Sequence, residues 1–215
     1  MNSKERKYWY KIGDSMDLGL IKSKIETLKE EFRNEAIWYI LKGVIQTNKS
    51  NVDQQCEVIR NLRDFLHGDL ATFFNMTKVP GSDHGERLLQ HAIIHGKDQL
   101  VLTILEEPAV KVSFETSELR STPLHLALMN GLSHGVIQLL TTNYSMTRKN
   151  NQNTTPEDIA KITGNDEFLL LLAERQLAKS KGLNFFQLEK LSGTEESEDA
   201  SDKYQFTQNK PGASS

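Results

Sequence analysis

The sequence predicts an all-α fold in which short antiparallel helix pairs stack in one direction. Apolar residues recur at helical spacing, as they do in the segment 124–128. Two such stripes of apolar residues each follow a Thr-Pro dipeptide, one beginning at Thr122 and the other at Thr155. The two dipeptides are 155 − 122 = 33 residues apart. Because a fixed period of about this length marks a stack of repeated units, we expect an array rather than a single globular core.

The composition narrows the classes of function that the chain can have. Its apolar content of 37% is modest for 215 residues, which suits a thin array. The formal net charge of −3 provides no basic field to attract nucleic acid. Cys56 is the single cysteine, which excludes an intramolecular disulfide and fits a reducing compartment. No apolar run approaches the roughly 20 residues that span a bilayer, so we expect a soluble, cytoplasmic monomer.

Residues 1–78 are expected to form a helical N-terminal region that caps the array. Residues 1–13 are basic and aromatic. We interpret them as a frayed end whose aromatic side chains pack on the first helix, with a membrane-surface anchor as the alternative. The apolar stripe from residue 17 to residue 46 predicts one long helix, or two helices that break at Asn34.

Two further apolar stripes precede the array, at residues 58–66 and 70–76. This pair of expected helices is either a degenerate repeat or an atypical cap. Gly68 lies 96 − 68 = 28 residues before Gly96, which breaks the period. Large aromatic side chains such as Phe73 suit the covering of an apolar end, and we therefore favour a cap.

The central segment 121–140 carries the clearest signals for helix ends. Thr122 can cap a helix that begins at Pro123, because proline needs no hydrogen-bond partner in the first turn. Gly131 can end that helix in a left-handed conformation. A second helix is expected around residues 134–140, so that two short antiparallel helices form one layer.

The motif TPLH at residues 122–125, with Ala127 and Gly131 after it, resembles the core of an ankyrin repeat. A similar order of residues follows Thr155 and surrounds Gly96, which lies 131 − 96 = 35 residues before Gly131. The resemblance implies a short ankyrin-repeat solenoid over residues 79–191, with about three recognisable repeats at about residues 86–118, 121–153 and 154–178. It also implies that His125 forms a hydrogen bond between adjacent repeats.

The C-terminal end of the array needs a cover for its last apolar face. A capping helix is expected within residues 179–191, where Leu183, Phe185 and Phe186 supply apolar surface. From Ser192 onward the composition changes to Ser, Thr, Glu and Asp, and we predict a disordered acidic tail over residues 192–215.

Few side chains suggest catalytic or metal chemistry. His91 and His95 lie four residues apart on one expected helix, a spacing that suits two metal ligands. They have no acidic or cysteine partner at a familiar spacing, so we expect structural roles and no metal. Cys56 near a helix start lacks the flanking signature of a nucleophile. Phosphate-binding glycine loops and hydrolase elbows do not occur in the sequence, and we expect no catalytic residues and no cofactor.

The resemblance implies that a partner protein binds the concave side of the stack, through the loop tips and the exposed edge of each first helix. Carried over position by position, the partner-binding residues are His84, Glu86, Ile94, His95, Leu119, Ser121, Met129, Asn130, Asn151, Gln152 and Ile162. The apolar members of this set form a ridge rimmed by amides and histidines, which suits a protein surface or a peptide. Scattered apolar residues without a binding role are the alternative.

The sequence departs from the family pattern at four positions. Gln90 and Asp158 replace the histidine of the TPLH motif, and Arg120 and Asn153 stand where the family often has glycine. These departures weaken the transfer of family properties to the first and last repeats.

The leading hypothesis is a non-catalytic module for protein–protein interaction. The lysine- and asparagine-rich composition, the irregular repeats and the acidic tail resemble ankyrin effectors that bacteria deliver into the host cytoplasm by type IV secretion, where such effectors contribute to virulence. The alternative is an enzyme or modifier built on the N-terminal helices, to which the repeats recruit a substrate.

Overall fold

The computed structural model describes residues 1–66, 70–76, 87–107, 109–116 and 118–180, and all its regular elements within these ranges are α-helices. The prediction of an all-α fold is therefore confirmed. The chain divides into unit 1, residues 1–171, and unit 2, residues 172–215. The capping helix expected within residues 179–191 lies outside the described residues except for residues 179 and 180, which end the preceding helix. The acidic tail expected over residues 192–215 lies entirely outside them. No helix in the described part of the chain is both long and apolar enough to cross a membrane.

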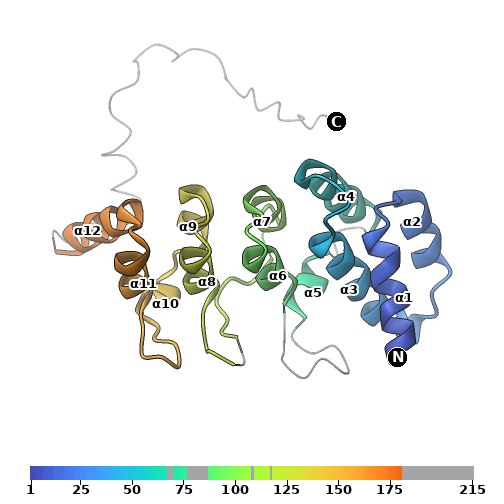
Figure 1. Cartoon of the computed structure of the whole chain (residues 1–215), viewed down its shortest axis with the longest axis horizontal. Coiled ribbons are helices and arrows are strands. Elements are labelled where there is room, and N and C mark those ends of the chain that lie inside the picture. Colours follow the sequence, from blue (N-terminus) through green and yellow to red (C-terminus); the bar gives the residue numbers. More distant parts are fainter. Residues whose placement is uncertain (67–69, 77–86, 108, 117, 181–215) are drawn as a thin grey trace, which may run out of the picture. The chain divides into compact units, whose positions relative to one another are not determined.

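Five helices precede the repeated segment, and local capping explains where most of them begin (Figure 1). They are α1 (Ser3–Asp14), α2 (Leu18–Glu26), α3 (Glu30–Gln46), α4 (Val52–Phe65) and the short α5 (Leu70–Asn75). Asn2 and Asn51 form capping boxes at the starts of α1 and α4, and Asp17 caps α2.

Two expectations about this region are wrong. Residues 1–13 are not frayed, because all but the first two belong to the capped helix α1. The break in the stripe falls at residues 27–29 rather than at Asn34, which lies inside α3. Asn34 has only a weak preference against the helix interior, and the packing of α3 against its neighbours outweighs it.

Helices α1 and α3 approach closely at two glycines. A Cβ atom at Gly13 would lie 1.9 Å from the carbonyl oxygen of Ile40, and one at Gly43 would lie 2.2 Å from that of Tyr10. Any other residue at either position would force the two backbones apart. The contact fixes α1 on α3 across about 30 residues of sequence, and no local pattern predicts it.

The repeated segment contains short helices, and those next to Thr122, Gly131 and Thr155 begin or end where the sequence predicts. The helices are α6 (Leu88–Ile94), α7 (Asp98–Leu105), α8 (Pro123–Met129), α9 (His134–Leu140), α11 (Pro156–Thr163) and α12 (Asp166–Ser180), with the short α10 (Asn143–Thr147) after α9. Thr122 and Thr155 both form capping boxes in front of a proline. Gly96, Gly131 and Gly164 follow α6, α8 and α11 with φ of +61°, +63° and +68°, which is the left-handed conformation expected there.

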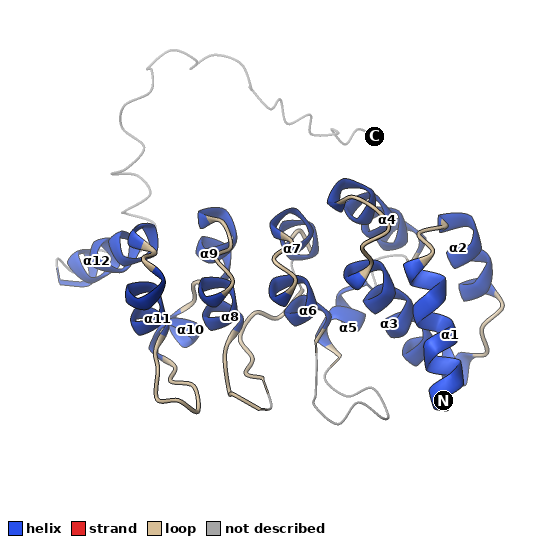
Figure 2. Ribbon diagram, in the orientation of Figure 1, coloured by secondary structure: helices blue, strands red, loops and turns tan. Residues whose placement is uncertain are grey.

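Within unit 1 the helices form two rows (Figures 1 and 2). Helix α3 contacts α6, α6 contacts α8, and α8 contacts α11, while α4 contacts α7 and α7 contacts α9. The pair that precedes α6 and α7 is therefore α3 with α4, and the expected pairing of residues 58–66 with 70–76 is wrong. Helix α5 instead contacts α3 and α6, just as α10 contacts α8 and α11.

Candidate functional site

Three exposed apolar side chains occupy equivalent positions on α6, α8 and α11. Ile94, Met129 and Ile162 have exposed fractions of 45%, 50% and 79%. Each lies two residues after an alanine that is completely buried, at positions 92, 127 and 160. Because consecutive helices of this row are in contact, the three side chains form one line, which we call the apolar row.

Helical geometry explains why these residues are exposed. Successive residues of an α-helix are separated by about 100°, so a residue two positions from the buried alanine points to the opposite side. The same rotation keeps Leu124 and Leu128 of α8 completely buried. Exposing a large apolar side chain at each of three equivalent positions has no stabilising effect on the fold, and such a line is typical of a binding surface.

The residue that follows each member of the apolar row is polar and carries no formal charge at neutral pH. Asn130 donates a hydrogen bond to the carbonyl oxygen of Leu126 (2.8 Å), and Thr163 donates one to that of Ile159 (2.9 Å). The Leu126 carbonyl oxygen also accepts the backbone N–H of Asn130 (3.0 Å), so the side-chain bond is an additional one at this helix end. Partial burial, followed by the nearby cation of Lys97, lowers the pKa of His95 below its ordinary value, so this imidazole is neutral at pH 7.

The loops before α8 and α11 are joined to each other through Asn151. Its backbone N–H donates to the carbonyl oxygen of Leu119 (2.8 Å), and its side-chain amide donates to that of Glu118 (2.6 Å). Leu119 remains 40% exposed, and Gln152 is exposed as well. Asn151 is also exposed, but its amide N–H already has a partner within the fold.

Backbone conformation explains the departures from glycine in these loops. Arg120 and Asn153 have φ of +50° and +60°, so both adopt the left-handed conformation for which glycine is the usual choice. Both loops therefore have a glycine-like backbone conformation although neither position is a glycine. Asn153 tolerates this conformation better than Arg120 does.

Three residues of the expected partner-binding set are not part of a described surface. Ser121 is completely buried, because its N–H donates to the Thr116 hydroxyl (3.1 Å) and its carbonyl oxygen accepts from the Thr116 N–H (2.9 Å). Its assignment as a contact residue is therefore wrong. His84 and Glu86 lie outside the described residues.

Two histidines, His91 and His125, are buried and hydrogen-bonded within the fold. His91 is buried, 3.0 Å from the side-chain nitrogen of Gln46 on α3. His125 is completely buried in α8, where its Nδ1 accepts from the Thr122 N–H (3.2 Å) and its Nε2 donates to the carbonyl oxygen of Thr154 (3.1 Å). This second bond crosses from α8 to the loop before α11, as the resemblance implies for the TPLH histidine.

Candidate metal and nucleophile residues do not come together in the described part of the chain. No three His, Cys, Asp or Glu side chains there are grouped as a metal ion would require. Cys56 is buried within α4, where a thiol is shielded from substrates.

A groove at the N-terminal end of unit 1 was not predicted from the sequence. It measures about 500 Å³ and lies between α1 and the segment that joins α2 to α3. Tyr8, Trp9, Leu28 and Phe32 line it. The aromatic cluster Tyr8-Trp9-Tyr10 was the available signal, but a close approach of α1 to the α2–α3 segment cannot be deduced from spacing.

Comparison of the chain with models of known protein families gives no match, and comparison with curated protein sequences gives none either.

Proposed function

We propose that the chain is an ankyrin-repeat protein without catalytic activity, which binds another protein through the apolar row. The observation that carries this proposal is the exposure of Ile94, Met129 and Ile162 at equivalent positions on three neighbouring helices. The ankyrin assignment draws support from the capped Thr-Pro helix starts, the left-handed glycines and the interlayer bond of His125.

The partner surface that suits the apolar row is itself apolar and uncharged. Desolvation of three large side chains would provide the stabilisation, and neutral groups at positions 95, 130 and 163 would form the rim. Since salt screens mainly interactions between charges, we expect little change in this binding between 0.1 and 0.5 M sodium chloride.

The packing of the N-terminal helices supports a role as a cap rather than as an enzyme. Lys97 joins α3 and α4 to the first repeat through bonds to Ile45, Thr47 and Gln55. Terminal units of a stacked array must cover its apolar end, and this continuous contact fits that requirement. The hypothesis of delivery into a host cell depends on the acidic tail, which lies outside the described residues.

A pair of matched variants tests the proposed surface. Met129→Arg places a charge at the centre of the apolar row, whereas Leu139→Arg places the same charge on α9, where the leucine is 54% exposed. Met129 and Leu139 are similar in size and in exposed fraction. Both variants are therefore expected to fold, which circular dichroism checks.

Affinity capture from cell lysate, quantified by mass spectrometry, compares the two variants with the wild type. We expect Met129→Arg to capture at least about tenfold less of one partner protein than the wild type does. The reason is that an unpaired charge in a desolvated contact costs roughly 1–3 kcal/mol or more. Leu139→Arg should retain it. Equal capture by all three proteins, or loss only in Leu139→Arg, would refute the assignment of the apolar row.

A further inference from the structure

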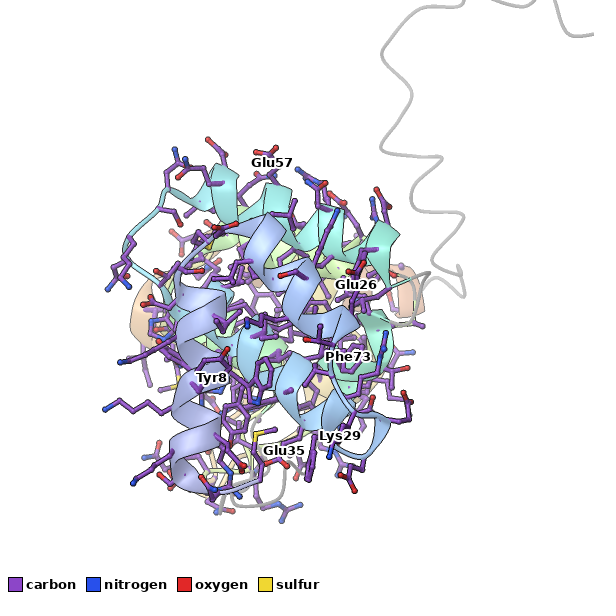
Figure 3. The ribbon with its side chains drawn as sticks, turned by 90° about the vertical axis from the view of Figure 1, so that its right-hand side faces the viewer. Tyr8, Glu26, Lys29, Glu35, Glu57 and Phe73 are labelled. Atoms are coloured by element: carbon purple, nitrogen blue, oxygen red, sulfur yellow. The ribbon has the colours of Figure 1, made fainter. Side chains whose placement is uncertain are left out.

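The groove at the N-terminal end of unit 1 has an aromatic floor. Tyr8 and Trp9 of α1 pack edge to face with ring centroids 4.9 Å apart, and Phe32 of α3 lines the groove with them. Tyr8 and Phe32 remain 44% and 40% exposed. Figure 3 looks at this end of the molecule and shows Tyr8 and Lys29 on it. Exposed rings in a concave site are suited to hold an apolar side chain of a partner.

The lining of the groove carries two lysines and one glutamate, so its side chains have a net positive charge. Lys4 and Lys29 both line it, and within the described part of the chain neither ammonium group has an ion-pair or hydrogen-bond partner. Glu5 also lines the groove, where its carboxylate accepts a bond from the Asn2 N–H (2.6 Å) in the capping box of α1. Because that donor is neutral, the carboxylate offsets the charge of one of the two lysines. Glu30 and Glu31, in the first turn of α3, do not line the groove.

The groove is formed before any ligand arrives. Helix α1 is fixed on α3 by the glycine contact at Gly13 and Gly43. The ion pair between Arg6 of α1 and the largely buried Glu35 of α3 (3.3 Å) fixes the same two helices near the groove. Because a preformed site loses little conformational entropy on binding, a short ligand suffices to occupy it.

We propose that this groove binds a peptide segment of a partner protein in which a phenylalanine or leucine side chain is flanked by acidic residues. The apolar side chain lies on Tyr8, Trp9 and Phe32, and the flanking carboxylates lie against Lys4 and Lys29. Charge complementarity of this kind favours acidic over basic sequences. This site is distinct from the apolar row, and its ligand goes beyond the function proposed above.

The same charges disfavour a second copy of the chain as the occupant. In a two-fold symmetric contact through this groove, two surfaces with the same net positive charge would face each other. Like charges placed opposite each other weaken an interface.

The test uses the full chain and defined peptides. The probe is a nine-residue fluorescein-labelled peptide with a central Phe-Leu pair and two glutamates on each side. Its matched controls carry lysines in place of the glutamates, or glycines in place of the Phe-Leu pair. Fluorescence anisotropy at 0.05 and 0.3 M sodium chloride gives each affinity, and nuclear magnetic resonance gives the location through the tryptophan indole N–H signals.

We expect saturable binding of the acidic peptide that weakens at the higher salt concentration. The basic and glycine controls should bind at least about fivefold more weakly, since about 1 kcal/mol corresponds to a factor of five in affinity. The indole signal of Trp9 should shift with peptide concentration, while that of Trp38, which is completely buried, should not. Trp9→Phe identifies which signal belongs to Trp9.

Charge reversal at the groove provides the decisive comparison. Lys4→Glu combined with Lys29→Glu should lower the affinity for the acidic peptide at least about fivefold, because two attractive charge contacts become repulsive. Lys11→Glu, on the exposed part of α1 outside the lining, should change it little. The proposal is overturned if the acidic peptide does not bind, if the double reversal leaves its affinity unchanged, or if sedimentation shows a dimer that Phe32→Asp abolishes.

Discussion

A lysine joins the α3/α4 pair to the next layer, whereas a histidine joins the α8/α9 pair to α11. The Lys97 ammonium donates to the carbonyl oxygens of Ile45 (2.8 Å) and Thr47 (3.0 Å) and to the side chain of Gln55 (3.2 Å). The His125 imidazole donates to the carbonyl oxygen of Thr154 (3.1 Å). One junction between layers thus uses a charged ammonium donor, and the other uses a neutral imidazole donor.

The difference follows from what each layer offers at its junction. The last carbonyl groups of α3 lie beside Lys97, which precedes α7, and a cation is favourable at the C-terminal end of a helix. Burial lowers the pKa of Lys97, and its three acceptors compensate the cost of placing the ammonium there. The regular repeat instead buries a neutral ring that serves as acceptor for its own helix cap and as donor to the next loop. The irregular layer is thus joined by a charged donor with three acceptors, whereas the regular layer is joined by a neutral donor.

The largest expected effect is on the N-terminal side of the comparison. Gly43→Ala would place a Cβ atom 2.2 Å from the backbone oxygen of Tyr10, so α1 and α3 must separate. We expect a loss of about 3 kcal/mol in the free energy of unfolding, at the upper end for overpacked sites. Gly135→Ala in α9 meets nothing within 4 Å and should be stabilising by about 0.5–1 kcal/mol.

Chemical denaturation followed by circular dichroism measures both glycine variants. A cost below about 1 kcal/mol for Gly43→Ala would show that the two helices are not held at this distance, given that overpacking usually costs more.

Replacing Lys97 should have the next largest effect. Lys97→Met keeps the length of the side chain but leaves the Ile45 and Thr47 carbonyl oxygens without this donor. Hydrogen bonds from charged groups contribute about 1.5–3 kcal/mol, and we expect a loss in unfolding free energy of about 2 kcal/mol. Lys97→Arg should recover part of it. Equal stability of Lys97→Met and the wild type would contradict the role of this lysine as the connection between the layers.

The smallest effect is expected at His125, and it depends on pH. Burial, the largest cause, lowers the pKa of this imidazole from its ordinary value of 6.5 despite the opposing effect of the bond to Thr154. Its contribution to stability is therefore present above pH 6.5 and decreases as the pH falls toward the lowered pKa. Protonation of Nδ1 would also remove the acceptor for the Thr122 N–H.

The histidine variant isolates this contribution. His125→Gln should lose about 1–2 kcal/mol of unfolding free energy at pH 7.5, from one buried hydrogen bond and imperfect packing. Between pH 7 and pH 5 the wild type should lose more stability than the variant does. Melting temperatures of the wild type and the variant, measured over this pH range, test the prediction. If the two melting temperatures fall in parallel, His125 is not the titrating group.

The sequence predicts the regular layers of this fold better than the irregular one. Thr122, Thr155 and Gly131 act through the backbone of their own helices, so their effect can be deduced from local spacing. The pairing of α3 with α4 cannot, because no Thr-Pro start or left-handed glycine marks that layer. Gly13 and Gly43 are 30 residues apart, and nothing between them signals their contact.

The sequence likewise predicts part of the candidate surface, namely the apolar row, and not the contacts that depend on tertiary structure. The exposure of Ile94, Met129 and Ile162 follows from helical periodicity once the buried alanines are aligned. Ser121 is buried and forms two hydrogen bonds with Thr116, and the spacing of residues in the sequence does not indicate these bonds. The aromatic groove depends on how α1 approaches the α2–α3 segment, which is a tertiary contact.

Residue-specific photo-crosslinking tests the central functional claim most directly. A photoreactive amino acid is placed at position 94, 129 or 162 of the apolar row, or at position 139 on α9, and the full chain is irradiated in lysate. We predict that the same protein is crosslinked from all three positions of the row and not from position 139. Crosslinks from position 139 alone, or different proteins from each position of the row, would contradict the assignment of one binding surface.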